Sequence, residues 1–152
     1  CNTSQIMLQN RSGNGWIGTH KGLDLFNSKT GGFTHYANKT DDTTSLSHNN
    51  VWSLYEDRQG TLWVGCGSVY TLDNEKPEEG GLNSLDKRTG KFTRYLHDPT
   101  NPYSIANNFV TAIFEDSRGN FWVGTAGDGL HTLDRVSGNF THTITIFHIP
   151  KI

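Results

Sequence analysis

The stretch that decides the fold is YEDRQGTLWVG, residues 55–65, because it returns as FEDSRGNFWVG at residues 114–124. Both copies carry a Glu-Asp pair, a glycine three residues after the aspartate, and then Trp-Val-Gly. An acidic pair beside a tryptophan fits a duplicated active site, and it fits a duplicated piece of scaffold equally well. The rest of the chain decides between these two interpretations.

Aligned on Trp16, Trp63 and Trp122, the chain resolves into three copies of one unit. The tryptophans are 47 and 59 residues apart, and the extra residues lie between Trp63 and Gly81. Each unit holds four short apolar runs separated by turns rich in Asp, Asn, Ser and Gly. A period in the forties that is built in this way is typical of a β-propeller, whose blades are four-stranded antiparallel sheets. The sequence therefore predicts an all-β fold with three such blades.

We expect a single partial β-propeller domain over residues 1–152. Its blades are predicted at about 4–36, 51–95 and 110–147, with an insertion at 67–80 in the second blade. Propellers close with about four to eight blades, so three blades predict a fragment of a larger propeller. The chain begins at Cys1 and not at Met, which fits a lipid-modified mature terminus or a fragment, and we expect the fragment.

The composition is that of a globular domain and points to no nucleic-acid partner. Hydrophobic residues make up 33% of the 152 residues, 17 further residues are glycine, and the net charge is −2. No apolar run reaches the roughly 18–20 residues of a membrane span, and no signal sequence is visible. Two cysteines and seven histidines without ligand spacing predict neither a disulfide framework nor a metal site. We expect no cofactor.

The repeated acids are interpreted as scaffold, because they align with amides in the first unit. Asn10 stands where the other units have Asp57 and Asp116. An asparagine caps a turn as well as an aspartate does, but it cannot act as a general acid or base. A catalytic pair would not be repeated in each blade and neutralised in one. The other recurring positions receive the same structural interpretation: Trp16, Trp63, Trp122, Gly13, Gly60 and Gly119.

The units resemble a known family. The segments EDSRGNFWVGTAGDGLHTLDRVSGNFTHT and TRYLHDPTNPYSIANNFVTAIFEDSRGNFWVGT are similar to the two-component regulator propeller repeat, and the resemblance extends from about Ile6 to His142. The resemblance implies a propeller, usually of seven blades, that forms the periplasmic sensing part of a hybrid two-component histidine kinase or precedes a diguanylate cyclase. Many such sensors respond to oligosaccharides.

The first unit departs from the pattern, with Gly15 where the others have Leu62 or Phe121. The chain contains no kinase, transmembrane helix or output domain. Contact with a membrane would therefore come only through other parts of a full-length receptor.

Function is expected on the face of the propeller that carries the long connections. Hairpins within a blade are short and uniform, whereas the links from second to third strand and between blades are long and variable, and binding residues concentrate on such loops. In the insertion, Tyr70 could stack on a sugar ring, while Glu75 and Lys76 could fix hydroxyl or acidic groups. A solvated charged loop without a ligand is the alternative. The candidate ligand-binding residues are Lys21, Tyr70, Glu75, Lys76, Asp128 and His131.

The leading functional hypothesis is a non-enzymatic, ligand-sensing propeller segment. One alternative is a fragment of a sialidase or another glycoside hydrolase, whose blade motif has one residue between aspartate and glycine. Here two residues separate Asp57 from Gly60, so that match fails. A protein-interaction propeller without a small ligand is the other alternative.

Besides an oligosaccharide, the expected partners are further propeller blades or a second copy of the chain. Three blades leave one sheet face open at each end, and apolar residues should line these faces. We expect Ile6, Leu8, Phe121 and Val123 among them. Two chains would then complete a ring of six blades.

Overall fold

Each of the three repeats forms one four-stranded antiparallel sheet in the computed structural model, which describes residues 4–68 and 80–143. The first sheet contains β1 (Ser4–Gln9), β2 (Gly15–Thr19), β3 (Gly22–Phe26) and β4 (Phe33–Tyr36). The second contains β5 (Val51–Glu56), β6 (Leu62–Gly67), β7 (Gly80–Asp86) and β8 (Lys91–Tyr95). The third contains β9 (Val110–Glu115), β10 (Phe121–Thr125), β11 (Gly129–Asp134) and β12 (Asn139–Thr143). The prediction of an all-β fold with three four-stranded blades is confirmed.

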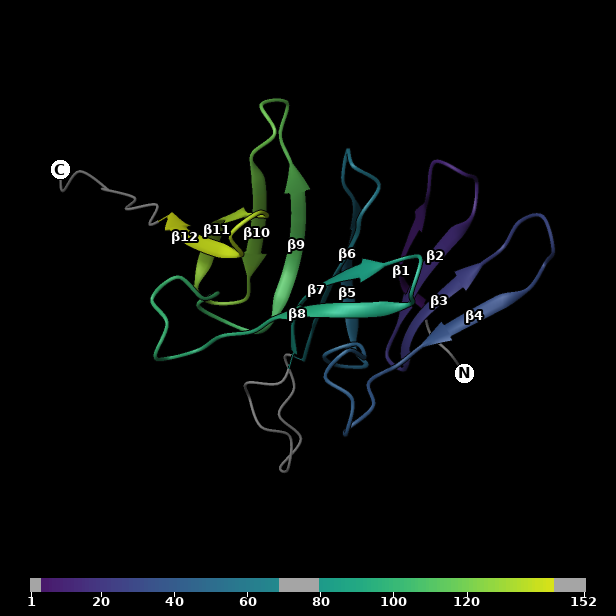
Figure 1. Ribbon diagram of the computed structural model, residues 1–152, viewed down its shortest axis with the longest axis horizontal. Helices are drawn as coiled ribbons and strands as arrows, with labels where there is room; N and C mark the ends of the chain where they lie inside the picture. The colour runs from purple at the N-terminus through teal and green to yellow at the C-terminus, as the bar shows by residue number, and fades with distance from the viewer. Residues whose placement is uncertain (1–3, 69–79, 144–152) are drawn as a thin grey trace, which may run out of the picture.

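The strands pair in sequence order within each blade, and the blades stand side by side (Figure 1). The short turns that follow β1, β5 and β9 lie at the top of the view, and the connection between β4 and β5 lies at the bottom. Among the first strands of the blades, β5 contacts both β1 and β9. The three blades therefore meet along their first strands, as the inner strands of a propeller do.

A glycine with a left-handed backbone closes the first hairpin of every blade. Gly13, Gly60 and Gly119 have φ angles of 85°, 83° and 82°. Each donates its N–H to the carbonyl three residues earlier, at 3.0, 2.9 and 3.1 Å. A residue with a Cβ adopts this conformation only at a cost, which explains why glycine recurs here.

Two apolar cores lie between the three blades. The first joins Trp16 and Leu23 of the first blade to Leu54, Leu62 and Val64 of the second. The second core is built around the indole of Trp63, whose ring centroid lies 4.7 Å from that of Phe121 and 5.5 Å from that of Tyr95. Trp16 and Trp63 thus pack as large apolar side chains between neighbouring blades, and the core of the molecule is the set of blade junctions.

The connections between blades also contribute to these cores. Leu46 and Ile105, at equivalent positions before β5 and β9, are fully buried. Beside them, Ser45 Oγ bonds to backbone groups of Lys39 and Asp42, and Ser104 Oγ bonds to those of Asp98. These serines fold the connections, as the repeat predicts, and neither is paired with a base.

The prediction of which side chains line the open faces is wrong. Phe121 and Val123 are buried against the second blade, and Ile6 and Leu8 pack into the core between the first two blades. Neighbouring residues in a strand point to opposite faces, so an assignment that is one residue out of phase exchanges the two faces completely. Trp122 is only half-buried, unlike Trp16 and Trp63, because no other blade within residues 4–68 and 80–143 covers it.

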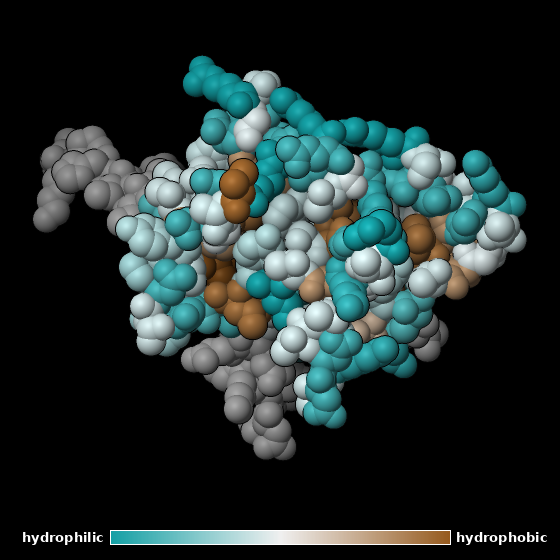
Figure 2. Space-filling view, in the orientation of Figure 1, coloured by the Kyte–Doolittle hydropathy of each residue, from teal (hydrophilic) through white to brown (hydrophobic). Residues whose placement is uncertain are grey.

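On the face shown in Figure 2, hydrophobic side chains form small separate groups within a mostly hydrophilic surface. The described residues include no helix that is long and apolar enough to cross a membrane.

Candidate ligand-binding face

The repeated aspartate fixes the first hairpin and the tryptophan of its blade. Asp57 Oδ1 accepts the backbone N–H groups of Gln59 and Thr61, both at 3.0 Å, while Oδ2 accepts Trp63 Nε1–H at 2.9 Å. Asp116 accepts the N–H groups of Arg118 and Asn120 and Trp122 Nε1–H in the same way. These bonds stabilise the carboxylate, and the indole bond is the main reason that the pKa of Asp116 falls to about 2. The repeated acid is therefore a turn and packing residue.

The first blade keeps the turn but loses the bond to the tryptophan. Asn10 Oδ1 accepts the N–H groups of Ser12 and Asn14, as the aspartates do in their turns. Trp16 Nε1 is buried and has no hydrogen-bond partner. An amide offers one oxygen where a carboxylate offers two, so Asn10 satisfies the turn only.

The repeated glutamate forms ion pairs at each blade junction. Arg58 of the second blade and Arg135 of the third both contact Glu115, whose side chain is 1% exposed. Arg135 also lies 3.0 Å from Asp57 of the second blade and covers the ring of Phe121. Glu56 is held in the same way by Arg11 and Lys87. Buried charges need such partners, and these acids serve the junctions between blades.

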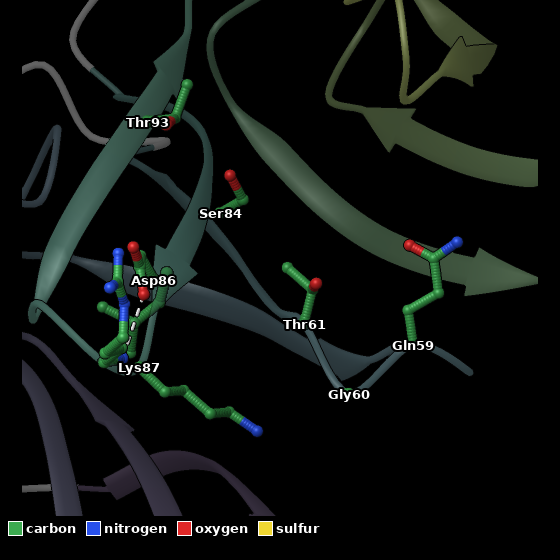
Figure 3. A pocket seen from close by; sticks show the side chains of 9 residues that line it. Gln59, Gly60, Thr61, Ser84, Asp86, Lys87 and Thr93 are labelled. Carbon is green, nitrogen blue, oxygen red and sulfur yellow. Dashed lines mark hydrogen bonds between the residues drawn. The ribbon is translucent and has the colours of Figure 1, made fainter.

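Two polar hollows lie at the hairpin ends of the second and third blades. The first, of about 390 Å³, is lined by Gln59, Gly60, Thr61, Ser84, Leu85, Asp86, Lys87, Arg88 and Thr93. The second, of about 440 Å³, is lined at the matching positions of the third blade, for example by Thr132, Asp134 and Arg135. In Figure 3 the labelled side chains spread around an open space and do not converge on one point. A hollow that recurs with the repeat is a product of the scaffold.

The opposite end of the blades carries a polar cluster that does not recur. Gln5 of β1, His20 of the β2–β3 turn and Asn50, which precedes β5, meet at the junction of the first two blades. Gln5 Nε2 donates to Asn50 Oδ1 at 2.6 Å and lies 3.0 Å from His20 Nδ1, which is itself 3.0 Å from Asn50 Oδ1. At the Asn50 position the third blade has Phe109, which packs edge-on against Trp52. We call this group the Gln5–His20–Asn50 cluster.

A second polar group lies at the same end of the third blade. Asp128, in the β10–β11 turn, accepts a hydrogen bond from Asn107 Nδ2 at 2.9 Å. His142 Nε2 bonds to the Asp128 carbonyl at 2.6 Å, and its ring stacks on that of His131 with 4.7 Å between centroids. Asp128 and His142 are exposed, whereas His131 is 1% exposed. Burial, followed by the nearby His142, lowers the pKa of His131.

The structure places the candidate residues on two separate blades. Lys21 is exposed beside His20 in the first blade, where its N–H donates to Thr19 Oγ1. Asp128 and His131 lie in the third blade, joined through His142, with the whole second blade between them and Lys21. His131 Nε2 accepts the Ala106 N–H, as Asn83 Oδ1 accepts the Ser47 N–H one blade earlier, so His131 holds the connection in place. Tyr70, Glu75 and Lys76 lie outside the described residues.

The sequence interpretation missed Gln5 and Asn50. Both depart from the repeat: Gln5 aligns with Trp52 and Thr111, and Asn50 aligns with Phe109. This departure was the available signal, because residues that recur hold the blades together while residues that do not recur are free to contact a ligand. Within residues 4–68 and 80–143, no group of three or more His, Cys, Asp or Glu side chains could hold a metal ion. Burial raises the pKa of the Cys66 thiol to about 12, so this cysteine is a poor nucleophile.

Comparison with solved structures identifies proteins with similar blades. The extracellular domain of a protein described as a hybrid two component system from B. thetaiotaomicron is 26% identical, with a TM-score of 0.75, over 93% of this chain and 18% of that chain. A second such domain from B. thetaiotaomicron is 18% identical with a TM-score of 0.39, over 93% of this chain and 23% of that one. PorZ, a surface component of the type-IX secretion system of Porphyromonas gingivalis, is 14% identical with a TM-score of 0.39, over 97% and 28%. With TM-scores of 0.39, the last two similarities support no conclusion about this chain.

The chain spans less than a third of the length of each of these proteins. No curated protein matches it. Residues 45–68 and 104–127 match the family described as two component regulator propeller. Each matched segment contains the first two strands of a blade and the Asp–Trp pair that fixes its first hairpin. The first half of the second blade and of the third blade therefore matches the two component regulator propeller repeat.

Proposed function

We propose that the chain is a non-enzymatic, ligand-sensing segment of an extracytoplasmic propeller in a bacterial two-component or related signal-transduction receptor. Its match to two component regulator propeller repeats supports this assignment, as does its similarity to the extracellular domain of a hybrid two component system. In a receptor of this kind the segment would lie in the periplasm. The rest of the sensor would supply further blades, the membrane anchor and the output domain.

The engagement of the repeated acids supports a role without catalysis. Asp57, Glu56 and Glu115 are each committed to turns, indoles or inter-blade ion pairs. Glycoside hydrolysis requires two carboxyl groups on either side of a bond, one of them free to donate a proton. A carboxylate whose lone pairs are taken by the scaffold is unsuited to that task.

The Gln5–His20–Asn50 cluster is the observation that carries the proposed ligand-binding role. It combines amide and imidazole groups at the end of the molecule where the long connections lie, with the exposed Lys21 beside it. Amides and imidazoles both donate and accept hydrogen bonds, as sugar hydroxyls require. Gly67, the last residue of β6, donates its N–H to the Asn50 carbonyl at 3.0 Å, and in the sequence Tyr70 and Lys76 follow it before β7 begins at Gly80. An oligosaccharide is therefore the ligand class that we propose.

A titration of neutral and acidic oligosaccharides against the chain tests the proposal. Asn50→Ala, Gln5→Ala, Lys21→Ala, Tyr70→Ala, Lys76→Ala and Asp128→Ala should weaken binding, each by about tenfold where a hydrogen bond to the sugar is lost. The matched controls are Arg88→Ala and Arg118→Ala at the hairpin ends, which should leave affinity unchanged. The opposite pattern would place the ligand on the hairpin face.

Enzymatic turnover is measured on the same panel. We expect no release of reducing sugar from any member. Release that Asp128→Asn abolishes would favour the glycoside hydrolase alternative.

A further inference from the structure

At each junction the first strand of one blade contacts the residue that precedes the first strand of the next blade. Between the first two blades this contact is the hydrogen bond from Gln5 Nε2 to Asn50 Oδ1 at 2.6 Å. Between the second and third blades it is the edge-on packing of Trp52 against Phe109, with 5.6 Å between ring centroids. Trp52 aligns with Gln5, and Phe109 aligns with Asn50. The same two positions are therefore polar at one junction and aromatic at the next.

A third position of this contact changes together with the other two. His20, which completes the polar cluster, aligns with Gly67 of the second blade. A Cβ on Gly67 would overlap Phe109, so the glycine leaves the space that the phenylalanine ring occupies. We call Trp52, Gly67 and Phe109 the aromatic group. It is the counterpart, one blade further on, of the Gln5–His20–Asn50 cluster.

A β-bulge lies at the first of these positions in every blade. The pairing of first and second strands passes over Gln5, Trp52 and Thr111, which have no partner in the register. A bulge bends its strand and changes the direction of a side chain, and bulges are common beside binding sites. The fold thus repeats the bulge in all three blades, while the side chain that it directs differs in each. A side chain that differs at a repeated backbone feature is not required by the scaffold.

Trp52 also differs from the tryptophans that hold the blades together. It belongs to neither apolar core within residues 4–68 and 80–143 and is half-buried, whereas Trp16 and Trp63 are 1% and 3% exposed. Trp63 and Trp122 each donate Nε1–H to an aspartate of their own blade. The buried Nε1 of Trp52 has no hydrogen-bond partner in the described part of the chain. A buried donor without an acceptor is uncommon in folded proteins.

We propose that Trp52 is a binding residue for the oligosaccharide and that the ligand lies across the aromatic group and the Gln5–His20–Asn50 cluster together. This inference rests on the proposed function and extends its site by one blade. The apolar face of one sugar ring stacks on the indole, and hydroxyl groups of the next sugar bond to the amides and imidazole of the cluster. A turn of the indole toward the ligand would also give its N–H the acceptor that it lacks.

The separation of the two groups sets the length of the ligand. β5 contacts both β1 and β9, so the two groups belong to consecutive junctions. Packed sheets lie roughly 10 Å apart, which is more than a single sugar ring spans. The ligand class is therefore an oligosaccharide of at least two units, with one ring that presents an apolar face.

Calorimetric titration of the full chain tests the role of Trp52. The probes are glucose, galactose, xylose and galacturonic acid, together with the linear oligosaccharides built from each. For the sugar that binds, affinity should rise at least about tenfold from the single unit to the oligosaccharide. Trp52→Thr, which copies Thr111 of the third blade, should lose most of this rise, and Trp52→Phe should keep most of it. Phe33→Ala is the control, because Phe33 is 65% exposed at the start of β4 and lies outside both groups.

Proton–nitrogen NMR of the wild-type chain tests the contact directly. The indole N–H signal of Trp52, assigned by its loss in Trp52→Phe, should shift when the oligosaccharide that binds is added. The signal of Trp63 should stay in place, since that indole is buried and bonded to Asp57. This measurement decides the question even where Trp52→Thr fails to fold, which far-ultraviolet circular dichroism would reveal.

The outcomes separate this inference from the proposed function. Binding that Asn50→Ala weakens, while Trp52→Thr leaves the rise in affinity unchanged, would overturn the role of Trp52 and retain the sensing function. A Trp52 signal that does not move while the oligosaccharide is bound would do the same. Absence of binding by every probe would overturn both.

Discussion

Trp63 Nε1 donates a hydrogen bond of 2.9 Å to Asp57 Oδ2, and this bond joins the first hairpin of the second blade to the core between two blades. The third blade repeats it between Trp122 and Asp116 at 3.0 Å. The carboxylate in the turn thereby accepts a hydrogen bond from the indole N–H, which is the one polar group of a tryptophan side chain that otherwise makes apolar contacts. In the first blade the bond is absent, because Asn10 stands at the position of the aspartate.

Asn10→Asp should stabilise the chain. The second carboxylate oxygen gives the buried Trp16 N–H the acceptor that it lacks, for a gain of about 1 kcal/mol in the free energy of unfolding. Urea denaturation measures this gain. The same change in a Trp16→Phe background is the control and should bring no gain, since the indole N–H is gone. An equal gain in both backgrounds would mean that the turn, and not the tryptophan, responds.

Asp57→Asn should destabilise the chain more than Asp116→Asn. The Asp57 carboxylate also forms an ion pair with Arg135 of the next blade. The hydrogen bonds to the Asp116 carboxylate come from its own blade, and Arg58 of the second blade bonds only to the Asp116 backbone carbonyl. Removing one charge of a buried pair leaves Arg135 without that partner, so we expect a loss of about 2 kcal/mol or more at Asp57. Denaturation of the two variants side by side measures the difference. Equal losses would contradict a structural role for the inter-blade pair.

Gly65→Ala and Gly124→Ala should separate a covered face from an open one. A methyl group at Gly65 would overlap Ser53 Oγ and lie 2.7 Å from Val110, so we expect overpacking to cost about 1–3 kcal/mol. At Gly124 the nearest atom would be Ala112 Cβ at 3.4 Å, and we expect stability near that of the wild type. The ranking of the two melting temperatures checks this.

Low pH should lower the stability of the third blade by protonating two groups, Asp116 and His131. The pKa of Asp116 is lowered from 3.8 in the unfolded chain to about 2, so its contribution to stability is present above pH 4 and is lost as the pH falls toward 2. NMR titration of the Asp116 carboxyl group measures this pKa. Trp122→Phe should raise it, since the indole bond is the largest cause of the shift.

His131 should change the stability at a higher pH than Asp116 does. Its pKa is lowered below 6.5, so the unfolded chain binds a proton more readily than the folded one, and stability falls as the pH drops below 6.5. Protonation of Nε2 also removes the acceptor for the Ala106 N–H. His131→Asn copies Asn83 of the second blade and should hold the connection at all pH values. The difference in melting temperature between pH 7 and pH 5.5 should shrink in this variant.

The blades, their turns and the structural role of the recurring residues could be derived from the sequence. Alignment of the three units reveals them, because a tight turn at Gly60 or a plate at Trp63 needs the same residue type in every blade. The comparison of Asp57 with Asn10 was enough by itself to predict that the repeated acids are structural residues and not catalytic ones. These are local requirements of a four-stranded sheet, so the residues that meet them can be identified from the local sequence.

The tertiary structure decided which face of each blade is covered and which polar residues meet. Strand alternation gives two faces but does not say which of them meets the next blade, so Phe121 and Val123 were assigned to the wrong side. The Gln5–His20–Asn50 cluster joins residues up to 45 positions apart across two blades, and His131 is buried by a connection that starts in the preceding blade. Such contacts depend on how whole sheets pack against one another, and that packing cannot be deduced from the spacing of residues along a single strand.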